Sequence, residues 1–290
     1  MLRVSRNALP QEAEAELNRL HAFLSAETTS DKQWKEFQKT ETYRTVRQVL
    51  ETMFHGKCAY CEAAGATHIE HHWPKSPHSH NSHRGSPTRM FRWDNFILAC
   101  SQCNVECKGS HMNWDEAGNP LLLNPCHPED DPLCYFTIQL HSESEPAFTL
   151  GWIDPQPNLS PSANQKAEYT LRRLKLNQRD YLVAGRARTL KHFFRLIHFL
   201  QELGPDYEAP EGHTLRVSLI ELLIASEPHL APIRQVLYAQ PEIRQQLLES
   251  VPELEAILNS WALPPTNDCV HVAAIESRRT VPETHSPTGT

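Results

Sequence analysis

Four cysteines of this sequence form two pairs, each with two residues between its members. The pairs are Cys58 with Cys61, in the run CAYC, and Cys100 with Cys103, in the run CSQC. Four thiolates spaced in this way can close a tetrahedral zinc site, although buried thiols are the alternative. The residues between the pairs, 62–99, outnumber the roughly 15–20 of a simple zinc ribbon. We therefore expect a structural zinc ion and an inserted structural unit between the pairs.

The remaining four cysteines show no such pattern. Cys107 follows Cys103 by four residues and could compete with it as a metal ligand, whereas Cys126, Cys134 and Cys269 have no matching partner. In an intracellular chain of this size, cysteines are more readily metal ligands or free thiols than a disulfide framework. We expect all four to be free thiols.

A second group of chemically capable residues lies between the cysteine pairs and just after them. It begins with IEHHWPK at 69–75, continues with WDN at 93–95, and ends with Asn104 and KG at 108–109. In order and spacing the group resembles the HNH endonucleases, in which a β-hairpin and a helix form a ββα-metal fold. The resemblance implies that Glu70 and Asn104 hold a metal ion, that His71 takes a proton from water, and that Asn95 orients the loop carrying His71.

These roles suit the cleavage of a phosphodiester bond. The reaction needs a nucleophilic water and relief of the charge that develops on the phosphorus and the leaving oxygen. Imidazole, with a reference pKa of about 6.5, can accept the proton near neutral pH. Carboxylate and amide oxygens are hard ligands that suit Mg²⁺ or Mn²⁺. Successive strand residues point to opposite faces, so Glu70 and His71 can serve one phosphate only if the strand ends there, which Pro74 makes plausible.

Other interpretations of the same residues stay open. His71 could be a packed or metal-bound histidine, although its place beside an acid and between the cysteine pairs favours catalysis. His72 could support the metal, contact the phosphate or only pack. Asn95 also fits an ordinary turn before the strand-like run FILA at 96–99.

Basic residues near this group are candidates for contact with substrate phosphate. The insert from 75 to 93 is rich in basic side chains and could follow the substrate backbone or be a flexible solvated loop. The phosphate candidates are Lys75, Arg84, Arg89, Arg92 and Lys108.

Charge is distributed unevenly along the chain, whose net charge is −7. Residues 166–195 carry nine basic and two acidic side chains, a local charge of +7, which favours phosphate contact over the commoner solvated helix face. Residues 205–263 carry nine acidic and three basic side chains, a local charge of −6. The two segments are expected to have different roles, because only the first has the right sign to meet nucleic acid.

The elements that must position these residues can be predicted from periodicity. Residues 11–56 and 162–203 show helical spacing, and helices continue to about residue 261. Runs at 135–140 and 148–152 predict a β-hairpin. The predicted class is α+β, with a zinc-stapled ββα-metal core, a small β-hairpin, flanking α-helices and a mostly helical C-terminal half. The predicted regions are a helical arm at 1–56, the HNH core at 57–112, the hairpin region at 113–160, a basic then acidic helical region at 161–262, and a disordered tail at 263–290.

Sequence runs beyond the HNH group of residues point to one type within the HNH endonucleases. They are KCAYCE at 57–62, LNP at 123–125, DDP at 130–132 and TLRRLKLN at 170–177. Over residues 30–200 the chain resembles the PtuB type of HNH endonuclease, found in Septu anti-phage systems and retron-associated systems. This resemblance implies an ATPase partner, PtuA-like and of the ABC or SMC class. We expect the acidic helices after residue 205 to dock on a basic surface of that ATPase.

The expected activity is therefore metal-dependent hydrolysis of DNA, with zinc as a structural ion and Mg²⁺ or Mn²⁺ in catalysis. An RNA target such as tRNA remains an alternative, because the ββα-metal unit contacts backbone more than base edges. A non-catalytic, zinc-stabilised scaffold that binds nucleic acid is a second alternative. The sequence has no apolar run long enough for a secretory signal or a membrane span, so we expect a cytoplasmic protein without membrane contact.

Overall fold

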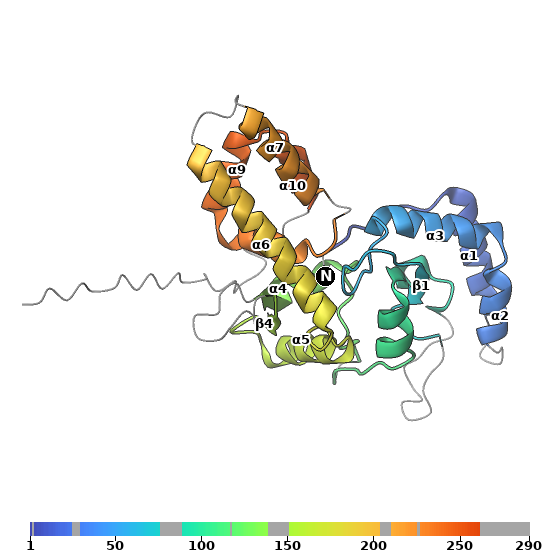
Figure 1. The fold of residues 1–290 in the computed structure, drawn as a ribbon. Helices are drawn as coiled ribbons and strands as arrows, with labels where there is room; N and C mark the ends of the chain where they lie inside the picture. Colours follow the sequence, from blue (N-terminus) through green and yellow to red (C-terminus); the bar gives the residue numbers. More distant parts are fainter. Residues whose placement is uncertain are drawn as a thin grey trace, which may run out of the picture.

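The computed structural model describes residues 1, 3–24, 30–75, 89–116, 118–138, 151–203, 210–224 and 227–261. The expected tail at 263–290, the phosphate candidate Arg84 and the thiol of Cys269 lie outside these residues. The described part combines many helices with two small antiparallel sheets, as the predicted α+β class requires (Figure 1).

Three helices form the N-terminal part of the chain and lie beside β1 in Figure 1: α1 (Gln11–Ala22), α2 (Ser30–Phe37) and α3 (Glu41–Phe54). Helix α3 begins where the Thr40 hydroxyl accepts a hydrogen bond from Tyr43 N, and it ends where His55 adopts a left-handed conformation, φ 51°. Its buried residues, which include Val46 and Leu50, face the core. The predicted helix at 11–56 is thus present as three helices.

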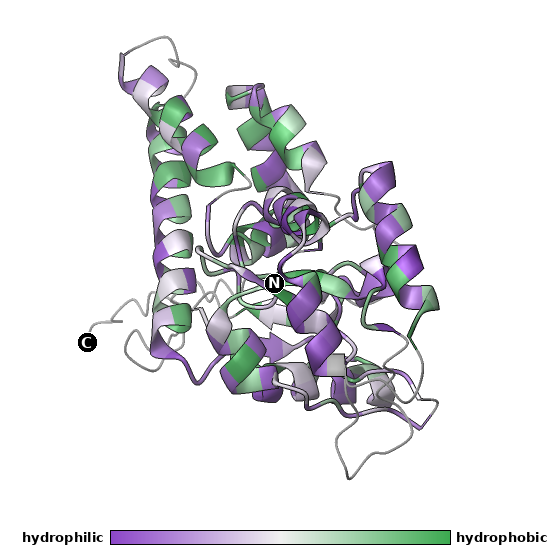
Figure 2. Cartoon of the chain, turned by 90° about the vertical axis from the view of Figure 1, so that its right-hand side faces the viewer, coloured by the Kyte–Doolittle hydropathy of each residue, from purple (hydrophilic) through white to green (hydrophobic). Residues whose placement is uncertain are grey.

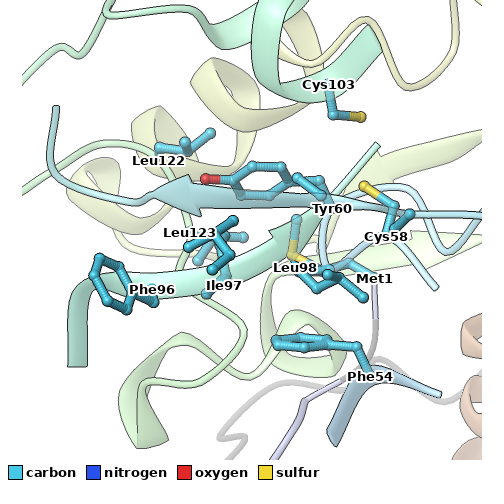
Figure 3. Close-up of a cluster of buried hydrophobic side chains, with 14 of the residues drawn as sticks. Met1, Phe54, Cys58, Tyr60, Phe96, Ile97, Leu98, Cys103, Leu122 and Leu123 are labelled. Carbon is cyan, nitrogen blue, oxygen red and sulfur yellow. The ribbon is translucent and has the colours of Figure 1, made fainter. Parts of the chain in front are cut away.

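A strand pair and a short helix follow the N-terminal helices. Strand β1 (His68–His71) pairs antiparallel with β2 (Phe96–Ala99), with His71 opposite Phe96. A 3₁₀ turn, η2 (Trp93–Asn95), precedes β2, and a π-helix, η3 (Gln102–Lys108), follows it. All four residues of β2 are buried, because β2 lies in the interior of the larger hydrophobic cluster. Figure 3 shows Ile97 and Leu98 of β2 packed among buried side chains from distant parts of the chain.

An antiparallel strand pair is present in the region of the predicted β-hairpin; residues 139–140 and 148–150 of the predicted strands lie outside the described residues, and the described second strand begins at Ile153. After η4 (Pro128–Asp130) and α4 (Pro132–Tyr135), strand β3 (Phe136–Ile138) pairs antiparallel with β4 (Ile153–Pro155). The prediction had placed the second strand at 148–152. Asn177 decides the position of β4, because its side chain accepts from Ile153 N at 3.0 Å and donates to Ile153 O at 2.6 Å.

The C-terminal half is helical. It comprises α5 (Pro161–Arg173), α6 (Asp180–Leu203), α7 (Pro210–Leu223), α8 (Ala231–Ala239), α9 (Pro241–Ser250) and α10 (Leu254–Ser260). The helix predicted at 162–203 is interrupted after α5, where Lys175 takes a left-handed conformation, φ 50°. Within the described residues, no helix has both the length and the apolar character needed to cross a membrane. Hydrophilic and hydrophobic residues alternate along the helices instead, as Figure 2 shows.

The hydrophobic core divides into two clusters. One cluster joins the N-terminal helices, the β1–β2 sheet and α5, and the other joins α6 to α7, α8, α9 and α10. Helix α6 runs from beside α4 and α5 to the second cluster (Figure 1). A buried ion pair also connects the two, because Arg234 of α8 donates two hydrogen bonds, of 2.9 and 2.8 Å, to the Asp131 carboxylate. Removing one partner of such a pair leaves an uncompensated buried charge, so α8 is firmly tied to the first cluster.

His229 occupies a polar part of this junction. Its backbone is left-handed, φ 60°, and its ring packs so closely on Gly185 of α6 that a Cβ at Gly185 would lie 2.5 Å from Nε2. Only glycine therefore fits at position 185. Burial lowers the pKa of His229 to about 4, against the opposing effect of Glu62.

The free energy of unfolding is expected to depend on pH through His229. An unfolded histidine binds a proton as the pH falls through about 6.5, whereas folded His229 stays neutral down to about pH 4. The free energy of unfolding should therefore fall by about 2 kcal/mol when the pH is lowered from 7.5 to 5, because only the unfolded state binds the proton over most of this range. The exchange His229→Asn removes the titration and suits the left-handed backbone. Urea unfolding at pH 7.5 and at pH 5 measures this change in the free energy of unfolding. The decrease should be smaller by about 2 kcal/mol in the variant than in the unmodified protein, and equal decreases in the two proteins would refute the role of His229.

Candidate metal centre and catalytic cavity

The two cysteine pairs meet in the structure. Cys58 and Cys61 lie in the turn after α3, Cys100 directly follows β2, and Cys103 is the second residue of η3. All four Sγ atoms lie within 4.8 Å of one another, and those of Cys61 and Cys100 are 3.8 Å apart. Zinc–sulfur bonds of about 2.3 Å in a tetrahedron place the sulfur atoms about 3.8 Å apart. The cluster could therefore hold a zinc ion, as the sequence predicted.

The other cysteines stand apart from this cluster. Cys107 is buried and free, and it does not join the four ligand candidates although it is close in sequence. Cys126 is also free. The expectation of a free thiol at Cys134 is wrong, because this residue is disulfide-bonded.

Arg179, just before α6, contacts the cysteine cluster. Its Nη2 donates to Cys103 Sγ at 3.3 Å, and its Nη1 donates to Tyr181 Oη at 3.2 Å. Tyr181 in turn donates a short hydrogen bond to Gln102 of η3. Arg179 is buried, and a guanidinium in this position favours the thiolate form of Cys103 that a metal requires. No motif could have indicated the contact, because the two residues are 76 positions apart.

Replacing Arg179 is expected to weaken the hold on zinc. The exchange Arg179→Gln removes the positive charge beside Cys103, and loss of an outer-shell partner typically costs 10–100-fold in metal affinity. Zinc release to a chromogenic chelator should therefore be about 10-fold faster in this variant. The matched control is Arg172→Gln, which removes an equal charge from an exposed position. Equal release rates in both variants would contradict the assigned role.

A second site, a cavity of about 710 Å³, lies where β1, η3 and the N-terminal helices meet. Five residues singled out in the sequence line it: Glu70, His71, Lys75, Asn104 and Lys108. Helices α2 and α3 supply the facing wall, including Asp31, Trp34 and Arg47. The sequence predicted these helices but assigned none of their residues to the site.

His71 ends β1 and is held in one orientation. Its Nε2 lies 2.9 Å from the carbonyl oxygen of Met90, and its ring packs edge-on against Trp34 and Phe96 at centroid distances of 4.4 and 5.2 Å. A carbonyl oxygen can only accept a hydrogen bond, so Nε2 carries the proton and Nδ1 is left with a free lone pair. Burial, with a contribution from Lys75, lowers the pKa of His71 to about 3. The imidazole is therefore neutral near pH 7.

Glu70 and Lys108 form a buried ion pair beside His71. Lys108 Nζ lies 2.5 Å from Glu70 Oε1 and donates to the carbonyl oxygen of His71 at 2.8 Å. Burial raises the pKa of Glu70, and the Lys108 ammonium opposes this effect. Lys108 is only 1% exposed, so in this conformation it meets Glu70 instead of a phosphate.

Asn104 of η3 reaches the same cavity from the other side. Its Nδ2 lies 3.3 Å from Nδ1 of His68, which also lines the cavity. Sequence reasoning missed His68. Strand alternation could have indicated it, because residues 68 and 70 of one strand share a face. Glu70, Asn104 and His68 together offer carboxylate, amide and imidazole donors at one end of the cavity.

Asn95 is buried beneath the loop that follows β1. Its side chain accepts from Trp73 N at 2.6 Å and donates to the carbonyl oxygens of Trp73 and Arg89, both at 3.0 Å. Its own carbonyl oxygen accepts from His72 N at 2.9 Å. Asn95 therefore binds both the residues that directly follow His71, which are His72 and Trp73, and Arg89, which lies shortly before β2. His72 itself is buried, does not line the cavity, and has its pKa lowered chiefly by burial.

The remaining phosphate candidates differ in their surroundings. Lys75 lines the cavity, 5.4 Å from the centre of the Trp34 ring and 3.5 Å from Asp31. Arg89 stacks on the Trp73 ring at 4.1 Å, and Arg92 pairs with Asp94 at 2.7 Å. Only Lys75 of these three therefore adds positive charge at the cavity itself.

Comparison with known proteins adds one relationship. The chain is similar to a Septu protein. The relative, Septu protein PtuB of Bacillus mycoides (strain KBAB4), is 30% identical over 115 residues, which cover 32% of this chain and 38% of the relative. The match thus spans well under half of that relative's length. No protein-family model matches the chain.

Proposed function

We propose that this chain is a metal-dependent endonuclease of the HNH type that hydrolyses phosphodiester bonds of DNA. The observation that carries the proposal is the hydrogen bond from His71 Nε2 to the Met90 carbonyl, which leaves Nδ1 as the unprotonated nitrogen of a residue that lines the cavity. A histidine held in one tautomer by a backbone carbonyl has an oriented lone pair, as a general base requires, although its pKa of about 3 makes it a weaker base than a free imidazole. The order strand, strand, helix of β1, β2 and η3 supports the same assignment.

The residues beside His71 fit a divalent cation. A carboxylate and an amide oxygen, from Glu70 and Asn104, match the hard-ligand preference of Mg²⁺ or Mn²⁺. Such an ion, when bound, would relieve charge on the phosphate and the leaving oxygen. His71 would take a proton from the attacking water at Nδ1. Asn95 would keep the loop after β1 in position, and Lys75 would attract the phosphate to the cavity.

A non-catalytic, nucleic-acid-binding scaffold is the second candidate, and one observation favours it. The Lys108 ammonium already neutralises Glu70, at 2.5 Å, and a cation at Glu70 must displace or share that contact. In an endonuclease, metal binding therefore has to overcome this ion pair. In a scaffold, Lys108 would replace the metal permanently.

Metal-dependent cleavage decides between the two candidates. The purified full chain is incubated with supercoiled plasmid DNA and, separately, with tRNA, in Mg²⁺, Mn²⁺ or EDTA. The endonuclease proposal expects nicking of the plasmid with either ion and none in EDTA. Cleavage of tRNA alone would assign an RNA target. Absence of cleavage with both substrates, also in the presence of a PtuA-like ATPase, would refute the nuclease and leave the scaffold.

The similarity to a Septu protein supports a further part of the proposal: the chain is the nuclease component of an anti-phage system controlled by a PtuA-like ATPase. The acidic helices α7, α9 and α10 would dock on a basic surface of that partner, through exposed residues such as Glu221, Glu242 and Glu249.

Deleting these helices would remove part of the second hydrophobic cluster, so the docking surface is better tested by substitution. Changing these three residues to glutamine should reduce co-purification with the ATPase; undiminished co-purification would refute the docking surface.

A further inference from the structure

Several of the basic residues counted between 166 and 195 are engaged within the protein and do not face solvent together. Four of the nine make contacts within the protein. Lys166 pairs with Asp130, Arg173 donates to the carbonyl oxygen of Lys108, Arg179 donates to Cys103, and buried Arg186 donates to the carbonyl oxygen of Gly151. These four side chains hold the fold together, so the local charge of +7 overstates the positive charge open to a ligand.

Three of the remaining basic residues lie on one face of α6. Arg188, Lys191 and Arg195 are exposed and line a shallow depression together with His192. Their spacing of three and four residues places them along one side of the helix, opposite the buried residues that include Leu190 and Ile197. None of the three forms an ion pair with another described residue.

Exposed aromatic residues stand at both ends of this row. Tyr181 is 49% exposed and Phe199 is 47% exposed. Helical spacing continues from Tyr181 through Arg188 and Arg195 to Phe199, a length of about 27 Å at 1.5 Å per residue. We call this face, made of Tyr181, Arg188, Lys191, Arg195 and Phe199, the α6 stripe. A row of positive charges with aromatic rings is the arrangement that holds single-stranded nucleic acid, through phosphates and stacked bases.

The α6 stripe begins at η3, the helix that also lines the catalytic cavity. Tyr181 donates a hydrogen bond to Gln102, which is the first residue of η3. Asn104, two residues further along η3 and on a different side of that helix, lines the cavity. A strand that leaves the cavity and crosses η3 would therefore meet Tyr181 first. In Figure 1, α6 continues from there to the helices of the second cluster.

We propose that the α6 stripe binds a single nucleic-acid strand that extends from the catalytic cavity, with its phosphates on Arg188, Lys191 and Arg195. The proposal rests on the proposed nuclease function, and it adds where the substrate is held outside the point of cleavage. Positive charge, exposure and freedom from internal ion pairs give these three residues the chemistry for phosphate contact.

Salt dependence of binding tests the proposal. A fluorescein-labelled, 20-nucleotide single-stranded DNA is titrated with full-length His71→Ala protein at several KCl concentrations, so that binding is measured without cleavage. Adding Arg188→Gln, Lys191→Gln and Arg195→Gln should lower the slope of log Kd against log salt by about 2, because about 0.7 counterion is released per phosphate. A separate exchange, Phe199→Ala, should weaken binding on the order of 10-fold through lost stacking.

A matched control removes the same charge elsewhere. Arg19 of α1, Arg44 of α3 and Lys39 of the turn between α2 and α3 are exposed, and their joint exchange for glutamine should leave the slope unchanged. An unchanged slope in the α6 triple variant would overturn the proposal. So would a triple variant that keeps its affinity for DNA but no longer co-purifies with the ATPase, because the stripe would then bind an acidic protein.

A small substrate separates this proposal from the proposed function. Bis(p-nitrophenyl) phosphate is too short to reach α6, so the triple variant with His71 intact should hydrolyse it as fast as the unmodified protein. Hydrolysis at the normal rate with an unchanged salt slope would overturn the stripe alone. Absence of metal-dependent hydrolysis in the unmodified protein would count against the nuclease, while the slope would still decide the stripe.

Discussion

Plasmid nicking by this chain is expected to fall about 1,000-fold when His71 is replaced by alanine. General-base catalysis typically contributes 10²–10⁴-fold to a rate, and His71 is the histidine that combines a lining position in the cavity with a backbone carbonyl on Nε2. The measurement is the single-turnover rate of nicking in Mg²⁺ with the protein in excess. A rate within threefold of the unmodified protein would show that another group takes the proton.

The packing of His71 requires a second variant beside the alanine exchange. The ring contacts Trp34 and Phe96 in the core, so its removal could also disturb the cavity. The exchange His71→Gln keeps an amide donor near the position of Nε2, facing the Met90 carbonyl, while removing the base. Both variants should retain bound zinc and the normal melting temperature if the loss is catalytic. The control is His198→Ala, an exposed histidine of α6, which should nick at the unmodified rate.

Loss of the four candidate zinc ligands is expected to unfold the core around β1, β2 and η3. Exchanging Cys58 or Cys103 for serine removes one of four thiolates, and a structural zinc site contributes on the order of 10 kcal/mol to folding. The cluster joins the turn after α3 to the end of β2 and the start of η3, so both the core and the cavity depend on it. We expect insoluble or partly unfolded protein with less than one zinc ion per chain, measured by metal analysis and circular dichroism.

Cys107 supplies the matched control for this experiment. It is buried like Cys103 and lies only four residues away, but its thiol does not join the cluster. The exchange Cys107→Ser should therefore keep the zinc and cost only the modest stability of a buried polar substitution. Full zinc occupancy in the Cys103→Ser variant would contradict the proposed site, and zinc loss in Cys107→Ser would make Cys107 a ligand.

Contacts between residues that are distant in the sequence could not be predicted before the structure was known. Arg179 entered the sequence analysis only as one of the charges at 166–195, and Asp131 only as part of the run DDP, yet one donates to Cys103 and the other holds Arg234 in the interior. Trp34 carried no expectation from the sequence, yet it packs on the proposed base His71. Such contacts depend on how helices pack against the sheet, and no periodicity along the chain encodes them.

The sequence by itself determined the chemistry of the centre. Two cysteine pairs with metal-ligand spacing meet as a cluster, and the run at 69–75 places an acid and a histidine at the end of a strand. These features are local, and their geometry follows from spacing and backbone periodicity. Only the tertiary structure decided the proton position on His71, the partner of Glu70, and which basic residues remain free for a ligand. Each of these depends on a carbonyl, an ammonium or a carboxylate brought by a different part of the chain, and burial makes such contacts strong.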